Sequence, residues 1–305
     1  MLIDIFGKKI PTRDTCCLYE KEKGPKYFED PFVYLFIQTS DVCQANCPFC
    51  IYHTDIPKDF DVDKLGVILR ELSNNDTFRV RKLNFTGGEP LLDLKLFDKL
   101  CNCVVNNFKF DDHYCGITLN TNGIHLKEFL PYNHLFDFIA LSRHHHLDKE
   151  NQEIFRTDKV PTFDEITNFY NDLDRKFIFI LRCNVITGYI DTYEKVKAYM
   201  DAFLEKDITV FSFVTLMPNN EFCNTHQVDF NKLINPSPEL FKTQQLTRIE
   251  DGKEYCQCRN YAYTSESGKI GTFYCRNFCN NYIKESTLVY DGKYLRYGFG
   301  GEIIF

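Results

Sequence analysis

The sequence predicts an α/β protein in which helices cover a mostly parallel β-sheet. Between residues 32 and 214, six apolar runs of strand length alternate with helix-like segments. Strands that are buried on both faces have continuous apolar runs, and strand–helix alternation is typical of parallel sheets. The hydrophobic period does not distinguish a closed or partial barrel from an open sheet.

Each predicted strand is an apolar run that ends at a polar or glycine-containing turn. The run 81–86 stops at Gly87 and Gly88, where the absent side chains let the backbone turn sharply and approach a ligand. The run 114–119 stops at the turn 120–123. The predicted strands are 32–39, 81–86, 114–119, 136–141, 176–185 and 208–214.

The predicted helices have apolar residues at helical spacing or helix-capping residues. Residues 61–73 are amphipathic, and Thr162 with Glu165 forms a capping box before the helix 163–173. Further helices are expected at 93–107, 125–130 and 191–204. This core spans 32–214, preceded by an N-terminal extension (1–31) and followed by a small, irregular, cysteine-rich extension (215–305).

Length and composition exclude several classes of protein. The 305 residues suit one large domain with a small appendix, and the net charge of −7 does not favour a nucleic-acid partner. No run of eighteen apolar residues occurs, so no membrane association is expected. The N-terminus lacks the layout of a signal peptide, which predicts a cytoplasmic protein.

Two groups of cysteines stand out among the 14 in the chain. Cys43, Cys47 and Cys50 have the spacing C-x3-C-x2-C in the loop after the first core strand, where α/β proteins place their chemistry. Three thiolates this close can hold zinc with a fourth ligand, or an iron–sulfur cubane with one open iron. The second group is Cys256, Cys258, Cys275 and Cys279, arranged around a predicted hairpin with a Ser-Gly-Lys turn. That group could hold zinc or an iron–sulfur cluster.

The C-x3-C-x2-C loop with Phe49 before its third cysteine resembles the signature of the radical S-adenosylmethionine (SAM) enzymes. The later Gly87-Gly-Glu-Pro90 segment is similar to the SAM-amine motif of that family. The resemblance implies a partial (βα)6 TIM-like barrel and a [4Fe–4S] cluster on Cys43, Cys47 and Cys50, with SAM on the fourth iron. An electron from the cluster would cleave SAM to a 5′-deoxyadenosyl radical, which abstracts hydrogen from a substrate C–H bond.

The same resemblance implies which other residues contact SAM. Glu89, after Gly87 and Gly88, would accept a hydrogen bond from the SAM ammonium, and Phe49 would pack near the adenine or face the core. Thr121 and Asn122 would face the carboxylate or sulfonium. Ser142 would reach the ribose or carboxylate, and Asn184 the ribose hydroxyls. Turn capping is the alternative role for these polar groups.

Most of residues 32–279 further resemble the GTP 3′,8-cyclase family of molybdenum-cofactor synthesis and its relatives with a twitch or SPASM-type extension. Shared segments include Thr86–Leu92, Arg182–Val185 and the tail hairpin. The resemblance favours an auxiliary [4Fe–4S] cluster on the tail cysteines. The tail departs from the cyclase pattern: Cys258 is followed by Arg259, Asn260 and Tyr261 where the cyclase has alternating arginines. This departure predicts a substrate other than GTP, with Arg259 and Tyr261 as candidate contacts.

The segment Ser142-Arg-His-His-His146 follows the fourth core strand. Arg143, His144 and His146 could orient the substrate, transfer protons or bind an anionic group. They could equally belong to an exposed loop. Adjacent histidines rarely converge on one ion, so a metal site is not expected here.

These observations predict a radical SAM oxidoreductase or lyase that modifies a ribosomal peptide and takes electrons from a partner such as flavodoxin or ferredoxin. A small-molecule substrate, such as a nucleoside, nucleotide or sugar, is the alternative. Residues 1–31 are shorter than the peptide-recognition domain that peptide modifiers often carry. A non-catalytic iron–sulfur or zinc-binding electron-transfer module is the alternative from another class, and it would need no Glu89.

Overall fold

The computed structural model describes residues 2–12, 31–51, 59–110, 116–173, 177–229, 233, 249–250, 253–254, 259–276 and 286–305. Its centre is a sheet in which six successive strands lie side by side and parallel. These strands are β3 (Phe32–Gln38), β4 (Arg79–Thr86), β5 (Ile117–Thr121), β6 (Phe138–Ser142), β7 (Ile178–Val185) and β8 (Val210–Thr215). The predicted partial (βα)6 barrel is confirmed.

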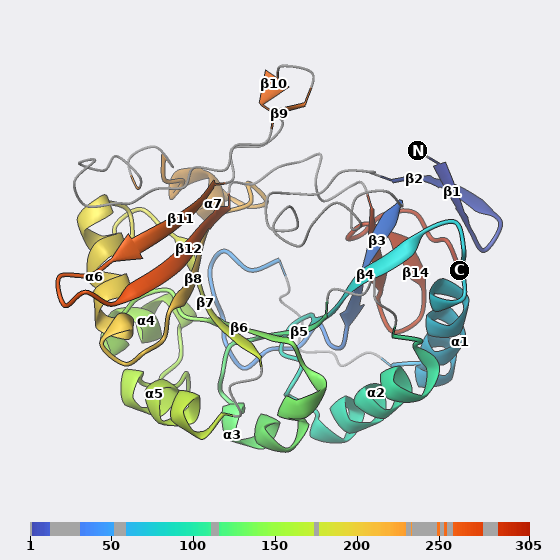
Figure 1. Ribbon diagram of the computed structural model, residues 1–305, viewed down its shortest axis with the longest axis horizontal. Coiled ribbons are helices and arrows are strands. Elements are labelled where there is room, and N and C mark those ends of the chain that lie inside the picture. Colours follow the sequence, from blue (N-terminus) through green and yellow to red (C-terminus); the bar gives the residue numbers. More distant parts are fainter. Residues whose placement is uncertain are drawn as a thin grey trace.

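Helices cover the convex side of the curved sheet, and the blue loop after β3 lies on the concave side (Figure 1). Thr162 and Glu165 form the predicted capping box of α5. The helices are α1 (Val62–Ser73), α2 (Leu94–Asn107), α3 (Leu126–Phe129), α4 (Asp148–Phe155), α5 (Phe163–Asp172), α6 (Tyr193–Leu204) and α7 (Glu221–Thr225), with a 3-10 helix at Leu130–Leu135. Helices α4 and α7 were not predicted, because each is short and neither shows an apolar stripe of useful length.

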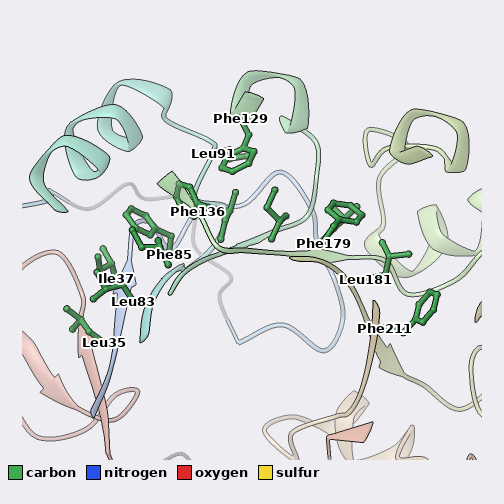
Figure 2. Packing of buried hydrophobic residues seen from close by; sticks show 14 of the residues in the cluster. Leu35, Ile37, Leu83, Phe85, Leu91, Phe129, Phe136, Phe179, Leu181 and Phe211 are labelled. Atoms are coloured by element: carbon green, nitrogen blue, oxygen red, sulfur yellow. The ribbon is translucent and has the colours of Figure 1, made fainter. Parts of the chain in front are cut away.

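The hydrophobic core lies between the sheet and these helices. Side chains such as Leu35, Leu83, Phe179 and Leu181 point from the strands toward the helices (Figure 2). In β7 every second residue is buried, and Arg182 and Asn184 alternate with the core residues. Strand β7 therefore buries one face in the core and carries Arg182 and Asn184 on its opposite face.

The C-terminal region extends both edges of the sheet. Strand β12 (Ile270–Arg276) pairs in parallel with β8, and β11 (Arg259–Thr264) pairs with β12 as the predicted hairpin. At the other edge, β13 (Thr287–Tyr290) pairs in parallel with β3, and β14 (Leu295–Tyr297) pairs with β13. The region 215–305 was predicted to be an irregular appendix, but its described strands continue the sheet beyond residue 214.

The N-terminal extension contains a hairpin of β1 (Leu2–Ile5) and β2 (Lys8–Pro11). Ile3, Ile5 and Ile10 join the hydrophobic core. Two two-residue strands, β9 (Ile249–Glu250) and β10 (Lys253–Glu254), also pair. Among the described residues, no helix has the length and apolar character needed to cross a membrane.

Candidate functional site

The loop that carries Cys43, Cys47 and Cys50 is held by elements far away in the sequence. The N–H of Asn46 donates to the carbonyl of Phe155 at the end of α4, at 3.0 Å. The side-chain amide of Asn220, which caps α7, donates to the carbonyl of Pro48 at 3.0 Å. The thiol of Cys223 on α7 donates to the carbonyl of Phe49 at 3.6 Å. The two unpredicted helices therefore position the cysteine loop.

Sequence reasoning missed Asn220 and Cys223. The Asn-Asn-Glu sequence before α7 is an N-cap signal that could have located the start of that helix. Its contact with Pro48 joins residues that lie far apart in the chain, and no local pattern reports such a contact.

The environment of the three cysteines fits an iron–sulfur cluster. Burial raises the pKa of the Cys43 and Cys47 thiols, and the neighbouring charge of Cys50 raises both further. Thiols in such a place become thiolates when a cationic metal centre offsets their charge. In the described part of the chain, no three His, Cys, Asp or Glu side chains converge closely enough for a single ion. A cubane would bind each thiolate to a different iron, so it does not require the three sulfur atoms to converge on one ion.

Gly87 and Gly88 pack directly on the backbone of the cysteine loop. A β-carbon on Gly87 would lie 2.3 Å from the Ser40 carbonyl oxygen, and one on Gly88 would lie 2.1 Å from that of Val42. The N–H of Gly88 donates to the Ser40 carbonyl at 2.6 Å, and the N–H of Glu89 donates to the Val42 carbonyl at 3.0 Å. Both glycines are required because the two loops touch through their main chains.

The Glu89 carboxylate joins the loops that follow β4 and β5. It accepts hydrogen bonds from the Thr121 hydroxyl at 2.7 Å, the Asn122 N–H at 2.8 Å and the Leu91 N–H at 3.1 Å. Burial raises the pKa of the Glu89 carboxyl, and these donors oppose the rise. The protein itself supplies three donors to this carboxylate. The predicted contact of Glu89 with the SAM ammonium remains a prediction.

Asn122 connects this network to the cysteine loop. Its side-chain amide donates to the Cys43 sulfur at 3.3 Å and to the Gln44 side-chain oxygen at 3.5 Å. Glu89, Thr121 and Asn122 thus lie together beside Cys43, as the predicted common site requires. Their present contacts are with the protein, and the roles predicted for Thr121 and Asn122 toward SAM remain predictions.

Ser142 ends β6 and Asn184 is the second-to-last residue of β7, so both lie near the carboxyl ends of the parallel strands. Ser142 is the last residue of β6 and pairs with Arg182 of β7. Asn184 donates its backbone N–H to Nδ1 of His144 at 3.1 Å. Both side chains are half-buried. Their predicted contacts with SAM remain predictions.

The reading of Arg143 and His144 as an exposed loop or as substrate contacts is corrected by their burial. Arg143 is 1% exposed, and its guanidinium donates to the carbonyls of His145, His146 and Pro161 and pairs with Asp148 at 2.6 Å. With each guanidinium nitrogen bonded to the protein, Arg143 stabilises the loop between β6 and α4.

His144 also has a structural environment. It is 2% exposed, stacks on Phe155 at 4.7 Å and meets the edge of Phe49 at 5.1 Å. Burial lowers the pKa of His144 to about 3. Such a ring stays neutral near pH 7, which argues against the predicted proton transfer. His146 is half-buried and stacks on His145.

Phe49 lies between two groups of buried residues. It packs against the cluster formed by Ile154, Ile186, Leu216 and Cys223 and against the cluster formed by Cys47, Phe155 and Val160. It is itself only half-buried. The core-facing reading therefore accounts for its described contacts, and its packing on adenine remains a prediction.

Only part of the second cysteine group lies in the described residues. Cys275 is 2% exposed near the C-terminal end of β12. Because β12 runs parallel to the core strands, this end lies at the same end of the strands as the first cysteine loop. Cys256, Cys258 and Cys279 lie outside the described residues. Arg259 begins β11. The auxiliary cluster and the role of Arg259 remain predictions.

The predicted substrate contact of Tyr261 is not supported by its position. Tyr261 is 7% exposed in the hydrophobic core and stacks on Phe273 at 4.9 Å. Tyr263, two residues later on the same face of β11, donates to Asp201 of α6 at 2.6 Å. The alternation of the strand therefore turns both tyrosines toward the helix layer.

Comparison with protein families gives a match that covers most of the parallel sheet and its helices. Residues 37–226 match the Radical SAM superfamily. An uncharacterized protein of Methanocaldococcus jannaschii is 25% identical over 251 residues, which cover 79% of this chain and 84% of that protein. The GTP 3′,8-cyclase of Clostridium perfringens strain SM101 is 24% identical over 259 residues, covering 81% of this chain and 74% of the cyclase.

Solved structures of similar shape include Streptococcus suis SuiB bound to S-adenosylmethionine, with a TM-score of 0.49 and 18% identity over 65% of this chain. The chain spans 44% of SuiB. A radical SAM methyltransferase from Sphaerobacter thermophilus has a TM-score of 0.49 and 13% identity, covering 67% of this chain and 60% of the methyltransferase. Likenesses this distant say nothing about substrate.

Proposed function

Because the chain belongs to the radical SAM superfamily, we propose that it cleaves S-adenosylmethionine reductively and abstracts hydrogen from a C–H bond of a ribosomal peptide. Cys43, Cys47 and Cys50 would hold the [4Fe–4S] cluster. When bound, the cluster and SAM supply an electron and a carbon-centred radical. The protein holds these groups in place and excludes water.

The observation that carries this proposal is the contact between the two signature loops. The backbone of Gly88 and Glu89 bonds to Ser40 and Val42, directly before Cys43. The loop that would hold the cluster and the loop that would hold SAM therefore form one unit. A module that only transferred electrons would need the cysteines, but it would have no use for a second loop packed this closely.

Two features favour a peptide substrate, one observed in the sheet and one predicted from the sequence. Among the residues that the structure describes, β11 is the outermost strand of the sheet, where an extended peptide could add as a further strand. The tail cysteines would hold an auxiliary [4Fe–4S] cluster, a feature predicted from the resemblance to enzymes with twitch or SPASM-type extensions. Flavodoxin or ferredoxin would supply the electron.

A small molecule such as a nucleotide is the second candidate, favoured by the similarity to GTP 3′,8-cyclases over most of the chain. The concave side of β7 carries Arg182, which donates to Asn120 of β5 at 2.6 Å. These groups could bind a polar small molecule.

The reaction is tested by anaerobic reconstitution of the protein with iron and sulfide, followed by dithionite and SAM. We expect release of 5′-deoxyadenosine, and we expect Cys47→Ala to abolish it. Cys101→Ala is the matched control, because Cys101 is buried in α2 away from the site. A fully loaded cluster that releases no 5′-deoxyadenosine would refute the proposal.

The substrate class is tested by deuterium transfer. Extract from cells grown in deuterated medium is separated into peptide and small-molecule fractions, and each is added to the enzyme. Deuterium in the 5′-deoxyadenosine produced with the peptide fraction supports the peptide proposal. Transfer from the small-molecule fraction alone would favour the second candidate.

A further inference from the structure

We infer that the side-chain amide of Asn122 is a positioning group that raises the reduction potential of the cluster by donating a hydrogen bond to the Cys43 sulfur. The inference rests on the proposed function, because it requires the cluster to be bound at Cys43. It assigns to Asn122 a role directed at the cluster and separate from any contact with SAM.

The orientation of the Asn122 amide is determined by its own hydrogen bonds. Its Oδ1 accepts the N–H of Ile124 at 2.9 Å, so the amide nitrogen must be on the other side. That nitrogen lies 3.3 Å from the Cys43 sulfur. Asn122 is 7% exposed, so water has little access to compete for the bond. The donor is thus held against the sulfur.

Glu89 holds the backbone that carries this donor. Its carboxylate accepts the Asn122 N–H at 2.8 Å and the Thr121 hydroxyl at 2.7 Å, and it is 1% exposed. The Thr121 hydroxyl in turn accepts the N–H of Gly123 at 3.0 Å. Hydrogen bonds therefore hold the turn after β5 on both sides of Asn122. They keep the Asn122 amide within hydrogen-bond distance of the Cys43 sulfur.

A hydrogen bond to a ligand sulfur changes the reduction potential of an iron–sulfur cluster. Reduction adds one negative charge, so a donor stabilises the reduced form more than the oxidised form. Cys43 has one other described donor, the N–H of Ala45 at 3.4 Å. Because Asn122 supplies the shorter of these two bonds, its loss should shift the one-electron equilibrium about tenfold toward the oxidised form, or ~59 mV.

Asn122→Ser is the most direct test. The shorter hydroxyl can still accept the Ile124 N–H in a turn, but it cannot reach Cys43, and it adds no charge. Asn107→Ser is the matched control, since the Asn107 amide lies 3.7 Å from the Cys103 sulfur on α2, outside the site. The holoproteins are titrated without SAM, the reduced cluster is followed by electron paramagnetic resonance, and iron is counted per chain.

We expect Asn122→Ser to lower the reduction potential of the cluster by ~59 mV, which corresponds to a tenfold change in the one-electron equilibrium constant. We expect Asn107→Ser to leave the potential unchanged. Asn122→Asp keeps the acceptor for Ile124 and places an anion beside the sulfur, so its potential should fall further. An iron-loaded serine or aspartate variant with the wild-type potential would overturn the inference.

A third measurement needs no substitution. In wild-type protein with 15N-labelled asparagine side chains, pulsed electron paramagnetic resonance should detect an amide nitrogen coupled to the reduced cluster. The absence of that coupling would refute the inference even if neither variant retained iron. Release of 5′-deoxyadenosine is measured on the same wild-type preparation, so failure of the inference is distinguished from failure of the proposed function.

Discussion

The buried histidine His144 should make the protein less stable in mild acid. Its Nδ1 accepts the N–H of Asn184, and burial lowers its pKa to about 3, whereas an unfolded histidine has a pKa of ~6.5. Between these values the unfolded state binds more protons, so stability is lost as pH falls through this range. At pH ~5 the loss attributable to His144 is ~2 kcal/mol relative to neutral pH.

The variant His144→Phe isolates this effect. Phenylalanine can still stack on Phe155 but leaves the Asn184 N–H without its acceptor, which should cost about 1–3 kcal/mol at any pH. Phenylalanine does not titrate. The difference in unfolding free energy between wild type and variant should therefore decrease by ~2 kcal/mol from pH ~7 to ~5. Urea unfolding of the reduced apoprotein, followed by circular dichroism, measures this gap.

The control is His134→Asn, because His134 is exposed. Comparing gaps cancels the contributions of the other titrating groups. A gap between wild type and His144→Phe that did not change with pH would refute the assignment of His144 as a neutral buried ring.

Three further predictions concern the loops and the C-terminal strands. Gly88→Ala should lower iron incorporation, since its β-carbon would lie 2.1 Å from the Val42 oxygen; full iron content in a folded variant would contradict this. The triple Cys43/Cys47/Cys50→Ala variant should retain about four irons per chain on the tail cysteines, and zinc without iron would count against an auxiliary [4Fe–4S] cluster. Tyr263→Phe should cost ~1–2 kcal/mol in urea unfolding, because its hydrogen bond to Asp201 is lost; an unchanged midpoint would show that the bond adds nothing.

The predicted secondary structure was most accurate where local chemistry decides it. The capping box of Thr162 and Glu165 begins α5 as expected, and Asp61 caps α1. Helices α4 and α7 were missed because short helices depend on tertiary packing more than on an apolar stripe. The hairpin of β11 and β12 was predicted, but its pairing with β8 joins segments separated by about sixty residues and has no local signal.

In the candidate site too, local spacing identified some residues, and tertiary packing decided the positions of others. Sequence spacing alone identified Cys43, Cys47 and Cys50 as one group. Gly87 and Gly88 were expected to let the backbone approach a ligand, and the structure shows them packed on the backbone of the cysteine loop. The position of Asn122 against the Cys43 sulfur could not be predicted, since it depends on how the turn after β5 is bonded to Glu89.

The sequence by itself determined the parallel sheet, the three-thiol loop and the family resemblance, because these depend on residue type and spacing within short segments. Only the tertiary structure decided which polar residues hold the protein together. Arg143 and His144 looked available for chemistry, but they are buried by Asp148, Phe155 and Pro161. A side chain's partners are set by packing between distant segments, and that packing decides whether a polar group faces substrate or the core.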